Sequence, residues 1–261
     1  MAKLFLNQAK NYAAGRPGYP EELFRFIASK TSCHDLAWDV GTGSGQAAAS
    51  LGGIYKNVIA TDTSQKQLDF APKLPNVRYH CTPPTISMAD LTANIAAPAS
   101  LDLVTIAQAL HWFDLPTFYQ QVKCVLKRPE GVIAAWCYTI PRVNDRVDSI
   151  FQPFYSDSYP FWERARKLVD DKYTGIDFPF EPVDGEDHTG PFEFTSKRAM
   201  GLDDFLTYIR SWSAYQTAKE KGVELLTDDV INNFKRAWSE DGHDQKVVKF
   251  PVHLRIGRLG N

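Results

Sequence analysis

The stretch that decides the fold reads Ala37-Trp38-Asp39-Val40-Gly41-Thr42-Gly43-Ser44-Gly45-Gln46-Ala47. The apolar run Leu36–Val40 predicts a short strand, and a helix is expected to open at Ser44 within the glycine-rich segment. Glycines let the backbone turn sharply and approach a ligand closely, with N–H groups that point outward. A strand, a glycine loop and a helix in this order predict an α/β fold with a nucleotide-like ligand on the loop.

The residues on either side of the loop distinguish between cofactors. A dinucleotide site has the pattern G-x-G-x-x-G, whereas the residue three positions after Gly43 is Gln46. Asp39 stands just before the loop, where a carboxylate is a poor neighbour for a pyrophosphate but a good one for an ammonium group. S-adenosylmethionine has no phosphate and ends in an α-amino acid. The loop therefore favours S-adenosylmethionine over NAD(P). Binding of NAD(P) would instead make the chain an oxidoreductase.

A second acid supports an adenosine-containing ligand. The expected strand Val58–Asp62 ends in Asp62, 17 residues after Gly45. An acid at this point can accept hydrogen bonds from both hydroxyls of a ribose. Asp62 could also cap the helix that is expected to start near Ser64, and the two roles are compatible.

Strands and helices alternate over the first half of the chain. Further strands are expected at Val77–Cys81, Leu101–Ala107 and Gly131–Tyr138, and helices at Glu21–Lys30, Ser44–Leu51, Ser64–Phe70 and Pro116–Lys127. This alternation predicts a mostly parallel sheet with helices on both faces. In such sheets ligands bind at the carboxyl ends of the strands, near the point where the strand order reverses.

After Tyr138 the alternation stops. Nine of the thirty residues 151–180 are aromatic, against 13% in the whole chain, and only a short helix is expected near Phe161–Asp171. We interpret residues 140–190 as an inserted cap after the fifth strand. Its rings, Tyr155 and Trp162 among them, either wall a substrate pocket or attach the cap to the domain.

The alternation resumes towards the C-terminus. Strands are expected at Phe192–Thr195 and Val247–Ile256, and helices at Asp203–Lys219 and Thr227–Trp238. Pro251 predicts an edge position or a bulge for the last strand. The chain is thus expected to form one domain, with a cofactor-binding core in residues 1–139, the cap in 140–190, and segments that complete a seven-stranded sheet in 191–261.

Composition and charge exclude several classes of function. The chain has 261 residues, a formal net charge of −2 and dispersed charges, so neither nucleic acid nor a membrane surface is an expected partner. The four cysteines are far apart, and Cys81 and Cys137 lie in strand-like runs typical of buried, reduced thiols. No apolar run is long enough for a signal peptide or a membrane span. We therefore expect a cytoplasmic protein without a metal, of open oligomeric state.

Several segments together resemble a known family. The glycine loop and Ala60-Thr61-Asp62-Thr63-Ser64 resemble motifs I and II of the class I S-adenosylmethionine-dependent methyltransferases. More of the chain is similar to the methyltransferase type 11 group that includes trans-aconitate methyltransferase-like proteins, especially plant forms. The segments concerned are Tyr12-Ala13-Ala14-Gly15-Arg16-Pro17-Gly18-Tyr19-Pro20, Asp102-Leu103-Val104-Thr105-Ile106-Ala107-Gln108-Ala109-Leu110-His111-Trp112-Phe113, Trp212-Ser213-Ala214-Tyr215 and Leu254-Arg255-Ile256-Gly257-Arg258. The resemblance implies a Rossmann-like fold and transfer of a methyl group to a small molecule.

The resemblance also implies roles for individual residues. Asp39 would lie near the amino group of the cofactor, and Asp62 would hold its ribose. The other residues implied in cofactor binding are Tyr12, Gly41, Thr42, Gly43, Gly45, Thr63, Met88, Ala89 and Gln108. Met88 and Ala89 would lie at the adenine edge, although this chain reads Met-Ala-Asp-Leu-Thr where the group more often has an acid followed by Leu-Pro. The acceptor would meet Tyr19, Trp112, Tyr155 and Trp162.

The chemistry requires little of the protein beyond alignment. Methyl transfer from a sulfonium is an in-line displacement, and Gln108 would stand beside the methyl group. A carboxylate acceptor needs no base, whereas an amine or phenol acceptor would require one, for which His111 is the candidate. We favour the interpretation that His111 only packs the loop. A carboxylate also predicts an arginine clamp, for which Arg16, Arg142 and Arg198 are candidates. A protein that binds the cofactor for a non-methylating reaction is the remaining alternative.

Overall fold

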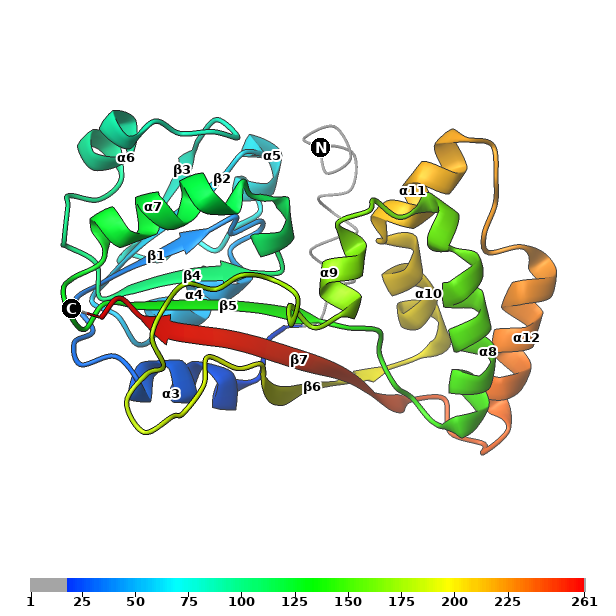
Figure 1. Ribbon diagram of the computed structural model, residues 1–261. Helices are drawn as coiled ribbons and strands as arrows, with labels where there is room; N and C mark the ends of the chain where they lie inside the picture. Colours follow the sequence, from blue (N-terminus) through cyan, green and yellow to red (C-terminus); the bar gives the residue numbers. More distant parts are fainter. Residues whose placement is uncertain (1–17, 261) are drawn as a thin grey trace.

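The computed structural model describes residues 18–260, which build one seven-stranded sheet (Figure 1). The strands lie in the order β3-β2-β1-β4-β5-β7-β6. β7 runs antiparallel to both of its neighbours, β5 and β6, and every other neighbouring pair is parallel. The bounds are β1 (Leu36–Val40), β2 (Asn57–Asp62), β3 (Val77–Cys81), β4 (Leu103–Ala107), β5 (Val132–Tyr138), β6 (Phe192–Met200) and β7 (Lys246–Arg258). The predicted Rossmann-like fold with a mostly parallel sheet is confirmed.

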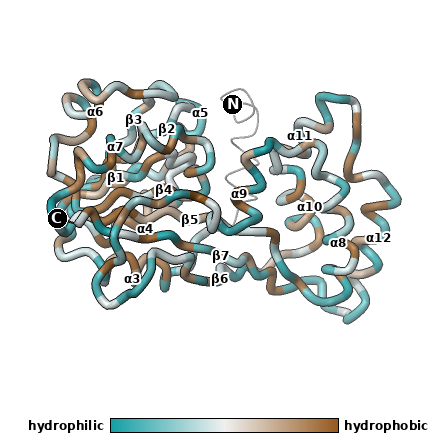
Figure 2. Tube along the Cα trace, in the orientation of Figure 1, coloured by the Kyte–Doolittle hydropathy of each residue, from teal (hydrophilic) through white to brown (hydrophobic). Residues whose placement is uncertain are grey.

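Helices cover both faces of the sheet because the strands alternate between two apolar cores. Along β5, Trp136 packs into a core with α3 (Glu21–Ser29) and α4 (Gln46–Gly52), whereas Cys137 packs into a core with α6 (Met88–Asn94) and α7 (Leu115–Val125). The short helix α5 (Gln65–Leu68) follows β2. Figure 2 shows this pattern as apolar strands in the middle and polar residues towards the outside.

A lobe of helices stands beyond the carboxyl end of β5 (Figure 1). We call α8–α12 the helical lobe: α8 (Asp145–Asp157), α9 (Arg166–Asp170), α10 (Leu202–Arg210), α11 (Ser213–Glu220) and α12 (Asp228–Ser239). The lobe thus draws on two segments of the chain, and α8 packs against α12. In the chain between these two segments, residues 171–190 return to the sheet. There Phe178 and Phe180 contact Tyr119 of α7. The division of the chain at residues 140–190 and 191–261 stays a prediction.

Four local expectations were wrong. In residues 140–190 only a short helix near Phe161–Asp171 was expected, whereas the 13-residue helix α8 also forms there. β7 is an interior strand despite Pro251, because the β5–β7 ladder ends at the pair Tyr138–Val252 and the missing N–H of Pro251 falls beyond it. The helix expected at Asp203–Lys219 is two helices, broken at Ser211–Trp212. Cys81 is exposed because β3 is an edge strand, whereas Cys137 is buried. Within residues 18–260 the structure has no helix that combines the length and the apolar character of a membrane span.

Candidate active site

The glycine loop joins β1 to α4 at the point where the strand order reverses between β1 and β4. Gly41, Gly43 and Gly45 all have positive φ, at 66°, 58° and 78°. A Cβ on Gly41 would lie 2.8 Å from the Cβ of Ala109, so this turn also passes too close to the end of β4 for a side chain. Both the conformation and the close packing require glycine at position 41.

Asp39 organises the loop from below. Its carboxylate is completely buried and accepts hydrogen bonds from the hydroxyls of Thr42, at 2.5 Å, and Thr105, at 2.7 Å. Burial raises the pKa of the Asp39 carboxyl to about 6, although the two hydroxyl groups oppose this shift. The completely buried carboxylate thus holds the loop from inside the protein, and its place near the amino group of the cofactor stays a prediction.

Asp62 lies at the carboxyl end of β2 and supports the same loop. One carboxylate oxygen accepts from the backbone N–H of Gly43 at 2.8 Å, and the other accepts from that of Ser64 at 2.9 Å. The side chain of Ser64 caps the N-terminus of α5. Asp62 is therefore not the N-cap of this helix, the alternative role considered for it from the sequence. Burial raises the pKa of Asp62, and its side chain borders the pocket described next.

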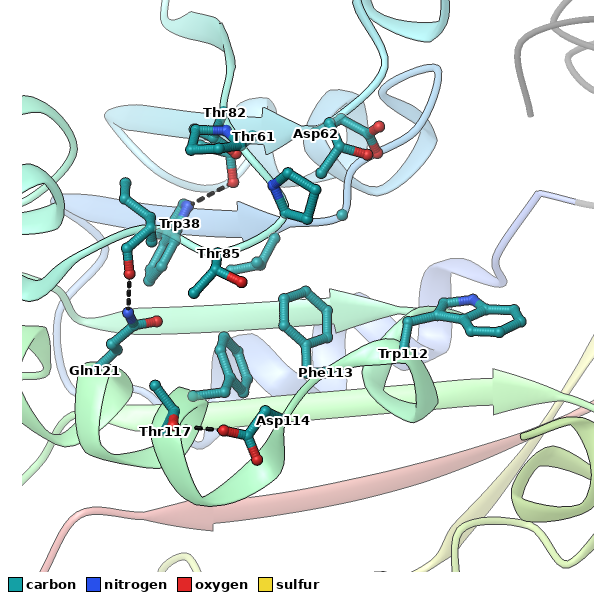
Figure 3. Close-up of a pocket in the computed structure, with 17 residues that line it drawn as sticks. Trp38, Thr61, Asp62, Thr82, Thr85, Trp112, Phe113, Asp114, Thr117 and Gln121 are labelled. Atoms are coloured by element: carbon teal, nitrogen blue, oxygen red, sulfur yellow. Dashed lines mark hydrogen bonds between the residues drawn. The ribbon is translucent and has the colours of Figure 1, made fainter. Parts of the chain in front are cut away.

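A pocket of about 340 Å³ opens at the carboxyl ends of β1, β2 and β3 and extends to α7 (Figure 3). Its lining residues are Trp38, Val40, Gly41, Thr61, Asp62, Thr63, Thr82, Pro83, Pro84, Thr85, Ile86, Trp112, Phe113, Asp114, Thr117, Phe118 and Gln121. None of these seventeen residues is basic and two are acidic. The pocket therefore suits a ligand with a flat apolar ring, hydroxyls and positive charge, and it has no cation for a pyrophosphate.

The two residues that the family pattern implies at the adenine edge lie outside this pocket. Met88 and Ala89 begin α6 and do not line the pocket, and the Met88 side chain is 40% exposed. The segment 82–86, directly after β3, lines it instead. Gln121 of α7 anchors this segment, since its amide donates to the carbonyl of Ile86 at 2.6 Å. The sequence rule that ligands gather at carboxyl ends of strands could have pointed to this segment.

Gln108 stands at the end of β4 with a positive φ of 58°. Its amide oxygen accepts from the backbone N–H of Tyr138 at 2.8 Å, and its amide nitrogen donates to the carbonyl of the same residue at 3.3 Å. The side chain therefore ties the end of β4 to the end of β5. This engagement supports a positioning role for Gln108 rather than contact with the methyl group.

His111 lies in η1 (Leu110–Trp112), the turn that follows β4. Its Nδ1 is 2.8 Å from the hydroxyl of Tyr173, and its ring packs on Trp112 at 4.6 Å between centroids. Burial, with a smaller contribution from the charge of Arg166, lowers the pKa of His111 to about 3. An imidazole with this pKa is a weak base at neutral pH, so the structure favours the packing interpretation over the base.

The residues predicted to meet the acceptor have different surroundings. Trp112 lines the pocket, at the end towards the carboxyl ends of β4 and β5 (Figure 3). Tyr19 packs edge-on against Trp136, at 5.3 Å between centroids. Tyr155 is 7% exposed and donates to Asp170. Trp162, which donates to Ser158, is partly buried. Tyr155 is thus held inside the helical lobe. The predicted contact Tyr12 lies outside the described residues.

Cys33, Asp35 and Asp102 form the one group of possible metal ligands among residues 18–260, with ligand atoms within 4.8 Å of one another. Lys56 lies 2.6 Å from Asp35, and Lys127 lies 2.6 Å from Asp102. These lysines already balance the two carboxylates, and the group is remote from the pocket in the fold, at the amino ends of β1 and β4.

The fold and the pocket together define a Rossmann-like core for an adenosine ligand without a diphosphate. Comparisons with known proteins agree. Residues 38–135 match the family described as Methyltransferase domain. The chain is 31% identical to a Dictyostelium discoideum protein that carries a methyltransferase name, over 96% of this chain and 92% of that protein. It is also 28% identical to Saccharomyces cerevisiae CRG1, named an S-adenosylmethionine-dependent methyltransferase, over 87% of each.

Solved structures give the same result. A structure described as a type II methyltransferase from Anaeromyxobacter dehalogenans superposes with a TM-score of 0.79 at 30% identity, over 94% of this chain and 98% of that one. The YcgJ protein of Bacillus subtilis shares the fold, with a TM-score of 0.51 at 13% identity over 93% and 100% of the two chains. The chain therefore belongs to the class I S-adenosylmethionine-dependent methyltransferases.

Proposed function

We propose that this chain methylates a small-molecule acceptor held between Trp112 and the helical lobe, and that the methylated atom is a carboxylate oxygen. The observation that carries the proposal is the pocket of about 340 Å³ that has no basic residue and ends at Trp112, towards the lobe. The resemblance to trans-aconitate methyltransferase-like proteins also supports a carboxylate. When bound, the cofactor supplies a methyl group on a positively charged sulfur. The acceptor oxygen bonds to the methyl carbon, and the electron pair of the broken S–CH3 bond stays on the sulfur.

The chain's own residues have to bind, orient and exclude water. Asp62 is placed to accept from ribose hydroxyls, while Phe113 and the prolines at 83 and 84 offer apolar walls for the adenine ring. Trp112 shields the end of the pocket from water. A carboxylate is already ionised near neutral pH and needs no base, in keeping with the low pKa of His111. This observation favours a carboxylate over an amine or a phenol.

The proposal is tested by binding and turnover in one preparation. We expect S-adenosylmethionine to bind in calorimetric titrations, and Asp62→Ala to weaken binding on the order of 10- to 100-fold, because hydrogen bonds to a charged acceptor are lost. Asp69→Ala, an exposed acid on the helix that follows Asp62, serves as the matched control and should leave the affinity unchanged. Methyl-labelled cofactor is then incubated with small carboxylic acids, amines and phenols, and we expect label in the acids.

Each other outcome points to a different function. If the protein binds NAD and does not bind S-adenosylmethionine, the proposal is wrong. Label in amines or phenols alone would leave the methyltransferase standing and overturn the carboxylate. Tight cofactor binding with no labelled product in any class would favour a non-methylating reaction.

A further inference from the structure

Arg166, the first residue of α9, is a largely buried arginine that has no role in the proposed cofactor site. This helix packs against η1, the turn that holds His111 and Trp112, and it stands between the sheet and the rest of the helical lobe (Figure 1). The Arg166 side chain is only 11% exposed. A guanidinium is costly to bury, so its surroundings have to account for the charge.

One edge of the guanidinium is held by the lobe. Nε donates to the hydroxyl of Tyr155 at 2.9 Å and to a carboxylate oxygen of Asp170 at 3.0 Å. Asp170 is itself fixed by the hydroxyls of Tyr155, at 2.8 Å, and Tyr159, at 2.6 Å. The guanidinium lies over the ring of Trp162 at 4.5 Å. These contacts fix the position and the plane of the group.

The other edge of the guanidinium has no hydrogen-bond partner among residues 18–260. Neither Nη1 nor Nη2 of Arg166 makes a hydrogen bond to any residue in 18–260. The two atoms are also absent from the fully buried polar atoms that lack a partner, so they retain access to solvent. A planar, oriented pair of N–H donors at the edge of a largely buried site matches the geometry of a carboxylate.

The charge acts on the groups around the methyl-transfer region. Burial is the main cause of the lowered pKa of His111, and the charge of Arg166 adds to it. His111 packs on Trp112 at the end of the cofactor pocket. The charge of Arg166 also acts on Cys137, near the end of β5, and couples to Tyr208 of α10. Arg166 is therefore near the carboxyl ends of β4 and β5 and near the lobe at once, where the acceptor is proposed to lie.

We infer that Arg166 binds the acidic group of the methyl acceptor through its two Nη atoms, with Asp170 and Trp162 as the positioning residues. The acceptor is then a small carboxylic acid with an apolar or aromatic body that fits beside the rings of the lobe. This inference rests on the proposed function. Of the arginines considered from the sequence, the Arg142 side chain is 58% exposed and faces Asp148 at 3.9 Å, Arg198 lies on β6, and Arg16 lies outside the described residues.

The test uses two probes that differ only in charge. Protein saturated with S-adenosylhomocysteine is titrated calorimetrically with benzoate and with benzamide. We expect benzoate to bind at least about 10-fold more tightly. Arg166→Gln should weaken benzoate binding on the order of 10- to 100-fold, and Arg166→Lys, which keeps the charge beside Asp170 but loses the fork, on the order of 10-fold. Affinity for S-adenosylhomocysteine should stay within about twofold in both variants.

Controls separate this inference from misfolding and from the proposed function. Arg142→Gln should bind benzoate like the unmodified protein. The double variant Arg166→Gln/Asp170→Asn removes both charges together and should fold while losing benzoate. Equal binding of benzoate and benzamide, no binding of benzoate, or unchanged binding in the folded Arg166 variants would overturn the inference. Loss of the proposed function instead appears as failure to bind S-adenosylhomocysteine or S-adenosylmethionine at all.

Discussion

The buried carboxyl of Asp39 lies beneath the glycine loop and is hydrogen-bonded to it. The side chain has no exposed surface, and its partners are neutral groups: the hydroxyls of Thr42 and Thr105 and the backbone N–H of Ala48. A carboxylate in such surroundings holds its proton more tightly than in the unfolded chain. The residue therefore links ionisation to folding in a way that an exposed acid does not.

The first prediction follows from this shift. Between the ordinary pKa of 3.8 and the raised value of about 6, the folded state binds a proton that the unfolded state has lost. The free energy of unfolding therefore falls as pH rises through this window, by on the order of 3 kcal/mol, at about 1.4 kcal/mol for each unit of pKa. Asp39→Asn removes the dependence. Urea unfolding at pH 4 to 7 should show the unmodified protein losing this amount relative to the variant.

A matched control excludes general titration effects. Asp69 is exposed at the end of α5, and its side chain accepts a hydrogen bond from Gln65 of that helix. Asp69→Asn should therefore follow the unmodified protein at every pH. A difference between the unmodified protein and Asp39→Asn that stays constant from pH 4 to 7 would contradict the prediction.

Single residues were predictable from the sequence where they belong to one continuous motif. The conformation of the glycine loop and the place of Asp62 at the end of β2 follow from spacing and turn chemistry. Segment 82–86 and Arg166 were missed. Their proposed roles depend on contacts with parts of the chain that lie far away in sequence, and one sequence carries no direct record of such contacts.

At the scale of elements, periodicity predicted the existence of strands and helices better than their limits. The five parallel strands were found because their apolar runs are short and bounded by polar residues. Pro251 wrongly predicted an edge position for β7. A missing N–H weakens a sheet only where a neighbouring strand has a carbonyl to accept from it, and the ladder with β5 ends at Val252, one residue before Pro251 is reached. The break between α10 and α11 was hidden because both helices carry apolar residues at helical spacing.

Helix α8, which carries the Tyr155 hydroxyl that contacts Arg166, offers the next prediction. Asn144 caps α8, since its side-chain oxygen accepts from the backbone N–H of Val147 at 2.9 Å. Asn144→Ala should lower the free energy of unfolding by about 1 kcal/mol, because an N–H at the helix start loses its partner. Denaturant unfolding measures this loss. Ser156→Ala, exposed near the end of the same helix, should change stability by less than about 0.5 kcal/mol. Equal effects of the two substitutions would rule out the cap.

At the scale of the whole molecule, one apolar core joins the sheet to the helical lobe. The core that holds Trp136 and α3 continues without interruption into Phe151, Phe205 and Trp212 of the lobe. The sequence could not predict this continuity, because the lobe is assembled from two segments separated by β6, and the packing of α8 on α12 becomes visible only in the folded chain. A shared core predicts that sheet and lobe unfold together.

Trp212 tests this cooperativity directly. Its ring is 1% exposed and contacts five other rings of the lobe, with centroid distances between 5.5 and 6.0 Å. Trp212→Ala should lower the free energy of unfolding by about 3–5 kcal/mol through lost contacts and a cavity. Far-ultraviolet circular dichroism and tryptophan fluorescence should still report one coincident transition, because the core is continuous. Phe70→Ala, at a 52% exposed site, should be nearly neutral. A second, earlier transition in the variant would mean that the lobe unfolds on its own, and the shared core would then not be the link between acceptor site and sheet.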